Sequence, residues 1–292
     1  MIVRGEESVL VLGITGKQGS FWTERMREYG TRIVGGVHPH RAGGMHLGVP
    51  VWASARQAAE ATKIDVAVMF IPPFGVKQAA LEAIDAGIGK IVCLTEHVPV
   101  QDTMYLLAAA RERGARVIGP NTAGLVTAGA CFVGFMPAFN RRVFKPGNVG
   151  VISRSGSLGT LMCLQLVQNG LGISAFIGIG GDPIVGTTTG EALAALDHDP
   201  GTAAIALVGE IGGTMEEDAA VYARGMQKPV AAFIAGAASP TGKKMGHAGA
   251  IVMGDKGSYR GKRAALEAAG VNVCPTPQGV PQALARRLVR RP

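Results

Sequence analysis

Short runs of apolar, mostly β-branched residues alternate along this chain with helical patterns, and this alternation restricts the fold more than any other feature. In the first half the strand-like runs are 8–12, 32–37, 65–70, 90–94 and 116–118, and the helical patterns include 19–29, 76–86 and 100–113. Strands separated by helices of about 10–15 residues indicate βαβ units. The pattern therefore predicts an α/β fold with a parallel sheet covered on both faces.

The same alternation starts again after a less regular stretch that contains Arg141-Arg142 and Lys145-Pro146-Gly147. Strand-like runs follow at 149–152, 174–177, 203–208, 229–234 and 271–273, with helical patterns at 157–168, 190–196, 215–225 and 258–269. We therefore expect two doubly wound domains, 1–122 and 147–292, with a junction at 123–146. The length of 292 residues suits two domains of about 150 residues each.

Composition excludes several other classes of protein. Hydrophobic residues make up 47% of the chain and charged residues 17%, which excludes a disordered chain. The 43 glycines follow no three-residue period, which excludes collagen. No apolar run approaches the ~18 residues of a membrane span, and the first residues lack the pattern of a signal peptide. The four cysteines form no CxxC pair, so we expect reduced thiols, no metal site and a cytoplasmic location.

The net charge of +8 raises the question of an anionic partner. Aromatic and basic residues are not interleaved as in proteins that bind single-stranded nucleic acid, so we expect no nucleic-acid partner. A polyanionic small ligand or an acidic protein partner explains the positive charge at least as well as a nucleic acid would.

A glycine-rich loop, Gly13-Ile14-Thr15-Gly16-Lys17-Gln18-Gly19, follows the first strand and opens the first helix. This context is typical of a phosphate site at a helix N-terminus, although a tight turn alone could also require the glycines. The spacing departs from GxGxxG, and no acidic residue follows about 20 positions later to hold a ribose. Instead His38-Pro39-His40-Arg41 follows the second strand, which favours a ligand with an additional phosphate over NAD.

Two further loops lie at the ends of strands in the second half. Ser153-Arg154-Ser155-Gly156-Ser157 joins a strand to a helix, where its hydroxyls could bind an anion or simply cap the helix. The glycine-rich segment 178–184 lies at a strand's carboxyl end, where open α/β sheets bind ligands, but a structural turn explains it as well.

His247 lies in the segment Gly246-His247-Ala248-Gly249-Ala250, where small neighbours leave room around its ring. Glu210 follows another predicted strand and could accept a ring N–H, which would fix the tautomer and make the other nitrogen more nucleophilic. The alternatives are that His247 is structural and that Glu210 caps the next helix.

Nine motifs together resemble one family, the α subunit of succinyl-CoA synthetase (succinate–CoA ligase, nucleoside-diphosphate-forming). The resemblance extends from about Val9 to about Leu284, and the motifs occur in the family's order: Gly16-Lys17-Gln18-Gly19, Gly35-Gly36-Val37, Pro72-Pro73-Phe74, Thr95-Glu96, Gly119-Pro120-Asn121, Ser153-Arg154-Ser155-Gly156, Gly178-Ile179-Gly180-Gly181-Asp182-Pro183, Gly209-Glu210-Ile211-Gly212-Gly213 and Gly246-His247-Ala248-Gly249-Ala250.

The resemblance implies a Rossmann-type CoA-binding domain followed by a flavodoxin-like ligase domain. It implies that His247 is a phosphohistidine and that Glu210 positions it. The CoA-binding positions it implies are Gly16, Lys17, Gln18, Gly19, Pro72, Leu94, Thr95 and Glu96, with Arg41 where the family usually has Lys. The phosphate- or substrate-binding positions it implies are Asn121, Ser153, Ser155, Gly156, Thr160, Gly180 and Gly181.

The resemblance also implies a reaction and a partner. Succinate, CoA and ATP or GTP would be interconverted with succinyl-CoA, ADP or GDP and phosphate, through an acyl phosphate and the phosphohistidine, in the tricarboxylic acid cycle. An ATP-grasp β subunit would bind the nucleotide with Mg, in an αβ or α2β2 complex.

Three motifs depart from the family pattern. Ser157-Leu158-Gly159-Thr160-Leu161 replaces Thr-Leu-Thr/Gly-Tyr-Glu, so Thr160 stands where the family has a Tyr associated with the acid. Pro39-His40-Arg41-Ala42-Gly43 replaces PGKGG, and Gly119-Pro120-Asn121-Thr122-Ala123-Gly124 replaces GPNCPG. The acid therefore stays open between succinate, malate, citrate and another carboxylate. A CoA-binding regulatory protein that has lost catalysis is a further alternative.

Overall fold

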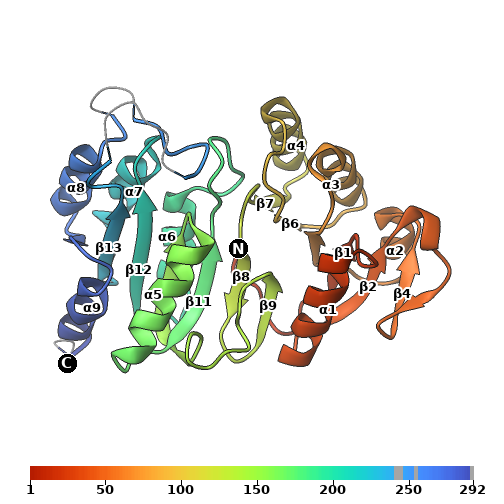
Figure 1. Ribbon diagram of the computed structural model, residues 1–292, viewed down its shortest axis with the longest axis horizontal. Coiled ribbons are helices and arrows are strands. Elements are labelled where there is room, and N and C mark those ends of the chain that lie inside the picture. The colour runs from red at the N-terminus through yellow and green to blue at the C-terminus, as the bar shows by residue number, and fades with distance from the viewer. Residues whose placement is uncertain (240–245, 253–255, 290–292) are drawn as a thin grey trace.

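The computed structural model describes residues 1–239, 246–252 and 256–289. Its described residues form two α/β units that lie side by side, each built around a seven-stranded sheet (Figure 1). The expected fold class is therefore confirmed.

The first sheet has the strand order β3-β4-β2-β1-β5-β6-β7. The bounds are β1 Val9–Leu12, β2 Ile33–Val37, β3 Met45–His46, β4 Val49–Trp52, β5 Val66–Met69, β6 Lys90–Cys93 and β7 Arg116–Ile118. Every pair is parallel except β3 with β4. Without β3 the order is that of the dinucleotide-binding Rossmann fold, which places the ligand crevice at the carboxyl ends of β1 and β5.

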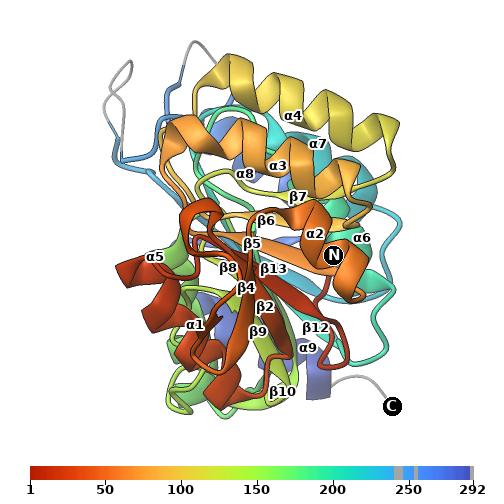
Figure 2. The ribbon, with the colours of Figure 1, turned by 90° about the vertical axis from the view of Figure 1, so that its right-hand side faces the viewer.

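Helices cover both faces of the first sheet because its strands are apolar on both sides. Leu10 and Leu12 pack with the helices α2 (Ala55–Ala61), α3 (Val76–Asp85) and α4 (Val100–Glu112). Val9 and Val11 face the opposite way, toward α1 (Lys17–Tyr29). Figure 2 shows α1 and the α3–α4 pair on opposite sides of the sheet.

The second sheet has the strand order β14-β13-β12-β10-β11-β8-β9. The bounds are β8 Gly124–Thr127, β9 Cys131–Gly134, β10 Pro146–Ser153, β11 Ile173–Gly178, β12 Ala204–Glu210, β13 Val230–Ala235 and β14 Asn272–Cys274. Its five parallel strands follow the flavodoxin-like order, in which the carboxyl ends of β10 and β12 flank the crevice. The helices are α5 Gly156–Gln168, α6 Thr189–Asp197, α7 Met215–Ala223, α8 Tyr259–Ala268 and α9 Gly279–Val289.

The stretch 123–146, expected to be an irregular junction, contains the strands β8 and β9 instead. They form an antiparallel hairpin that pairs with β11 and extends the second sheet. Phe132 of this hairpin is fully buried and packs against Tyr29 of α1, with ring centroids 5.5 Å apart. The hairpin therefore places one continuous core between the two sheets. The expected domain boundaries at 122 and 147 themselves stay a prediction.

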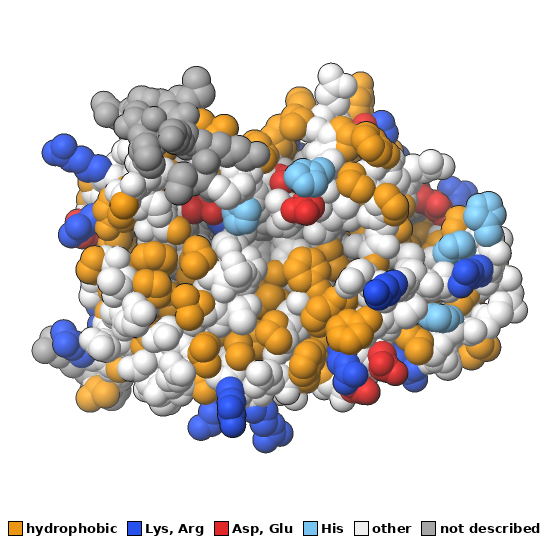
Figure 3. Space-filling view, viewed as in Figure 1, with side chains coloured by type: hydrophobic (Ala, Val, Ile, Leu, Met, Phe, Trp, Pro, Cys, Tyr) orange, Lys and Arg blue, Asp and Glu red, His pale blue; other side chains and the backbone are white. Residues whose placement is uncertain are grey.

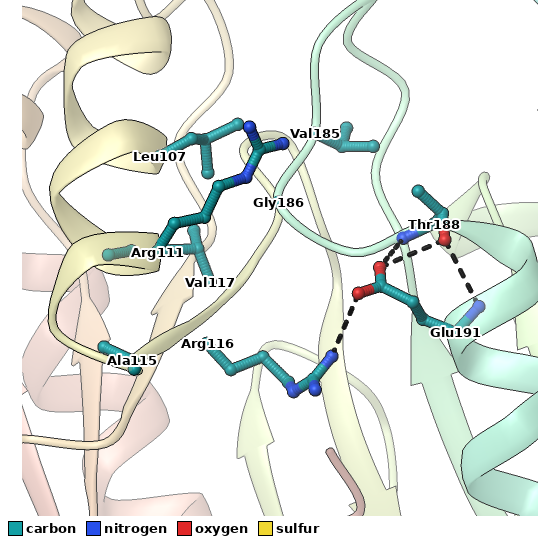
Figure 4. A pocket seen from close by; sticks show the side chains of 11 residues that line it. Leu107, Arg111, Ala115, Arg116, Val117, Val185, Gly186, Thr188 and Glu191 are labelled. Atoms are coloured by element: carbon teal, nitrogen blue, oxygen red, sulfur yellow. Dashed lines mark hydrogen bonds and ion pairs between the residues drawn. The ribbon is translucent and has the colours of Figure 1, made fainter.

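A seam with its own side-chain contacts separates the two units on the other side of the molecule. It lies between α4 and β7 on one side and the segment leading into α6 on the other, around a hollow of about 370 Å³ (Figure 4). Arg116 donates a hydrogen bond to Glu191 across this seam, at 3.4 Å. The amide of Gly186 donates to the carbonyl of Gly119 at 2.8 Å. The relative placement of the two crevices is thus fixed by contacts on both sides.

Candidate active site

A cleft of about 1000 Å³ opens at the carboxyl ends of β1, β5 and β6. The predicted CoA residues that line it are Gly16, Lys17, Gln18, Gly19, Pro72, Leu94, Thr95 and Glu96. Helix α1 begins at Lys17, and its N-cap Gly16 makes no side-chain capping bond, so the first amides of the helix have no side-chain acceptor at the cap. Such an N-terminus attracts phosphate.

Two glycines make this loop tight enough to form the cleft. A Cβ on Gly19 would lie 2.2 Å from the carbonyl oxygen of Gly13, and Gly13 itself has φ +82°. Only glycine adopts that conformation at low cost. The glycines therefore bring the helix N-terminus directly against the end of β1.

Arg41 is the predicted CoA residue that the structure does not bring to this cleft. It ends the short 3-10 helix Pro39–Arg41, is exposed, and does not line the cleft. A neighbouring hollow of about 370 Å³ includes His38 and Pro39, and it shares Ile71 and Pro72 with the main cleft. Arg41 itself lines neither of these hollows.

His247 and Glu210 lie side by side at the second crevice. Glu210 is the last residue of β12, and its Oε2 lies 2.8 Å from Nδ1 of His247. The imidazole is 29% exposed, so a reactant can reach it, whereas Glu210 is buried. Figure 3 shows histidine (pale blue) and acidic (red) side chains along the hollow between the two units. The hydrogen bond to Glu210 raises the pKa of His247, against burial, which lowers it. Within the described residues no hydrogen bond engages Nε2, the nitrogen opposite Glu210.

Glycine residues shape the space around the imidazole. A Cβ on Gly181 would lie 2.4 Å from Cγ of His247, so any side chain there collides with the ring. The amide of Gly249 donates to the carbonyl of Gly181 at 3.2 Å. Gly212 has φ +90°, and a Cβ there would lie 2.1 Å from the carbonyl oxygen of Gly249. The histidine segment is thus seated directly on the 178–184 loop and on the turn that follows Glu210.

Asn121 connects the two crevices through its main chain. It lines the cleft at the ends of β1, β5 and β6 and donates its amide to the carbonyl of Thr95 at 2.9 Å. Its own carbonyl accepts from the amide of Gly181 at 3.2 Å, and its side chain donates to Asp182 at 3.0 Å. Burial raises the pKa of Asp182. Gly180 has φ +119°, and a Cβ there would meet the carbonyl of Pro120 at 2.2 Å.

The remaining predicted residues surround the start of α5. Ser155 is its N-cap and accepts from the amide of Leu158 at 3.3 Å, while Ser153 donates to the carbonyl of Ser155 at 2.6 Å. Gly156 packs on Ala123. Thr160 donates its hydroxyl to the carbonyl of Gly156 at 2.8 Å, inside the helix. The capping interpretation of Ser155 is therefore what the local geometry shows.

Sequence reasoning missed three charged residues beside this pair. Arg154 is buried and places Nη2 3.2 Å from Oε1 of Glu210, and Glu216 and Lys262 are fully buried behind it. Arg154 lay within a motif already singled out, but Glu216 and Lys262 belong to helices on which charges usually face solvent.

Neither a metal cluster nor a membrane-spanning helix occurs in the described part of the chain. Across 1–239, 246–252 and 256–289, no group of three or more His, Cys, Asp or Glu side chains is arranged to hold a metal ion. None of the helices within these ranges is both long enough and apolar enough to cross a membrane. All four cysteines are buried and unpaired.

Comparison with known proteins defines the class of the molecule. Residues 5–97 match the family described as CoA binding domain, and residues 152–272 match the family described as CoA-ligase. A CoA-binding Rossmann unit followed by a CoA-ligase unit makes this chain a CoA-ligase subunit.

Full-length relatives identify the family. The chain is 46% identical over 288 residues to the succinate–CoA ligase [ADP-forming] subunit alpha 2 of Archaeoglobus fulgidus, covering 99% of both. It is 41% identical over 282 residues to the ADP-forming sulfoacetate-CoA ligase subunit SauD of Bilophila wadsworthia, covering 96% of both. The chain belongs to the family of succinate–CoA ligase alpha subunits.

A solved structure shares the arrangement of both units. The ATP citrate lyase of Methanothrix soehngenii, in complex with citrate and coenzyme A, superposes with a TM-score of 0.89 at 25% identity. The match covers 99% of this chain and 51% of that one, so the chain corresponds to about half of the lyase.

Proposed function

We propose that this chain is the α subunit of a nucleoside-diphosphate-forming acid–CoA ligase and that His247 carries the phosphoryl group. The observation that supports this most is the pairing of an accessible imidazole with the buried carboxylate of Glu210, beside a CoA-sized cleft. Asn121 joins the two by main-chain hydrogen bonds.

The first step uses the neutral imidazole. With Nδ1–H donated to Glu210, the lone pair lies on Nε2 and attacks the γ-phosphorus of the nucleotide. The Nε2–P bond forms, the bond from phosphorus to the bridging oxygen breaks, and the nucleoside diphosphate leaves. Glu210 stabilises the positive charge that develops on the ring.

The second stage makes the thioester. A carboxylate oxygen of the acid attacks the phosphorus, the N–P bond breaks, and an acyl phosphate forms. The thiolate of CoA then attacks the acyl carbon, the C–O bond to phosphate breaks, and thioester and inorganic phosphate result. Lys17 and the amides at the start of α1 would hold CoA phosphates during this step.

The proposal includes a second subunit. The relatives are named alpha subunits or ligase subunits, which supports a partner subunit. We propose that this β subunit has an ATP-grasp fold and binds ATP or GTP with Mg, in an αβ or α2β2 complex. A role in the tricarboxylic acid cycle and a cytoplasmic location belong to the same proposal.

Phosphate transfer to His247 is tested with γ-labelled ATP and the partner subunit. We expect a base-stable, acid-labile label on the chain, and its loss in His247→Asn. A label that persists in His247→Asn would overturn the assignment of His247. CoA binding without thioester formation from any carboxylate would instead indicate a regulatory protein.

Succinate is our first choice of acid. The residue at position 160 and the name of one relative favour sulfoacetate as a second candidate. Thr160 replaces the family's Tyr, and its hydroxyl is bonded within its own helix. A relative at 41% identity is named a sulfoacetate-CoA ligase subunit. A thioester assay across succinate, malate, citrate and sulfoacetate identifies the acid by its kcat/KM.

A further inference from the structure

Four buried charges of alternating sign end at the imidazole of His247. In order they are Lys262, Glu216, Arg154 and Glu210, exposed by 0%, 0%, 3% and 6%. Nζ of Lys262 contacts Oε2 of Glu216, and Oε1 of Glu216 lies 3.8 Å from Nη1 of Arg154. Nη2 of Arg154 lies 3.2 Å from Oε1 of Glu210. Because an unpaired buried charge is strongly disfavoured, each member keeps the next in place.

The same residues also hold the backbone that carries Glu210. The amide of Glu210 donates to Oε1 of Glu216 at 3.3 Å, and Nη1 of Arg154 donates to the carbonyl of Gly212 at 3.2 Å. A Cβ on Gly209 would lie 2.8 Å from Oε1 of Glu216, so a side chain there would displace this carboxylate. Main chain and side chain of Glu210 are therefore both fixed from the side away from the imidazole.

The charged groups around the imidazole come from three segments. Glu210 ends β12, Arg154 follows β10, and Asp182 lies in the 178–184 loop. Behind them, Lys262 of α8 also lies 3.3 Å from Glu217 of α7. Of these groups, Arg154 opposes a proton on the imidazole, whereas Glu210 and Asp182 favour one.

We propose that Lys262 and Glu216 are positioning residues that hold Arg154 on Glu210 and thereby set the orientation and protonation of His247. The inference rests on the proposed role of His247 as phosphoryl acceptor. Lys262 balances Glu216, so Glu216 does not draw Arg154 away from Glu210. Glu210 is thus partly neutralised on one oxygen and presents the other to the ring.

Removal of Lys262 has a defined consequence. Glu216 becomes an unbalanced buried anion, and among the described residues Arg154 is the remaining cation paired with it. Glu210 then attracts the ring proton more strongly. His247 stays protonated to higher pH, and less of the nucleophilic neutral ring is present at pH 7.

The test is a titration of the His247 ring by NMR in the full-length chain, together with the pH profile of its phosphorylation by ATP and the β subunit. In Lys262→Met we expect both midpoints to rise by about half a pH unit, roughly a threefold change in the ionisation constant. In the double variant Lys262→Met/Glu216→Gln, Arg154 pairs with Glu210 again and the midpoint returns to that of the unmodified chain.

The matched control is Arg263→Met, one residue along α8. Arg263 is exposed and pairs with Glu267 of its own helix, so no shift is expected. If Lys262→Met does not fold, Glu216→Gln replaces it as the test variant. Arg154 then pairs with Glu210 only, and we expect the midpoint of the His247 titration to fall.

Unchanged midpoints in the folded variants would overturn the inference, as would a shift in Lys262→Met that the double variant does not reverse. The NMR titration needs no phosphorylation. A shifted midpoint in a chain that never takes up label would therefore refute the proposed function and leave the positioning network standing.

Discussion

At the scale of single residues, the pairing of His247 with Glu210 ties activity to pH. Glu210 raises the pKa of His247, so the neutral ring predominates only above a pKa that is higher than the ordinary value of 6.5. The phosphorylation rate should therefore fall as pH decreases through that raised pKa. The contribution of the His247–Glu210 pair to the free energy of unfolding has the opposite pH dependence. It is fully present below pH 6.5 and is lost as the pH rises through the folded-state pKa of His247.

Replacing the carboxylate tests this dependence. We expect Glu210→Gln to move the midpoint of the pH profile downward and to reduce the phosphorylation rate by about 10²-fold, a typical effect of losing such a positioned group. Rapid-quench measurements from about pH 5.5 to 8.5, a range that brackets the ordinary histidine pKa, give both quantities. An unaltered midpoint would mean that Glu210 does not control the ring.

Gly181 tests how tightly the imidazole is seated. A Cβ there would lie 2.4 Å from Cγ of His247, so Gly181→Ala should push the ring off Glu210 and slow phosphorylation by about 10-fold or more. Overpacking should also lower the free energy of unfolding by roughly 1–3 kcal/mol. Gly89→Ala is the control, because no atom lies within 4 Å of a Cβ at that position. Equal rates in the two variants would contradict the close contact between the ring and the 178–184 loop.

At the scale of elements, the start of α1 should dominate CoA binding. Lys17 lines the main cleft, whereas Arg41 ends the 3-10 helix outside it. We expect Lys17→Met to weaken CoA binding by about 10-fold, and Arg41→Met by less, because Arg41 does not line the cleft. Calorimetry with CoA and with dephospho-CoA separates the phosphates. A larger loss for Arg41→Met would show that the sequence-based assignment of Arg41 is right and that the exposed position is not the one used on binding.

Parallel strands were predictable because both of their faces are buried, which gives continuous apolar runs such as those that became β1, β5 and β12. The hairpin of β8 and β9 was missed, since its pairing with β11 depends on a contact distant in sequence. Helix α2 was also missed, because its seven residues are too few to show a clear helical period in the sequence.

The candidate site was predictable where it coincided with motifs, and His247 and Glu210 were found in this way. The burial of Glu216 and Lys262 beside this site could not be predicted from the sequence, because Glu and Lys in helical patterns ordinarily indicate a solvent-exposed face.

At the scale of the whole molecule, one core joins both sheets, so the chain should unfold as one unit. Phe132→Ala removes a fully buried ring from that core and should cost about 3–5 kcal/mol of the free energy of unfolding. Hydrogen exchange should then rise in strands of both sheets. Faster exchange confined to one sheet would show that the two units are energetically independent.

The place of the β8–β9 hairpin also governs how related chains can be recombined. A chimaera that takes its first half from one relative and its second half from another has to keep 124–134 with the second sheet. A crossover at 146 would give β11 a foreign neighbour, although it would keep Tyr29 of α1 with its own Phe132. A crossover ahead of residue 119 leaves the hairpin with its own sheet, and exchange of CoA specificity between relatives is best attempted there.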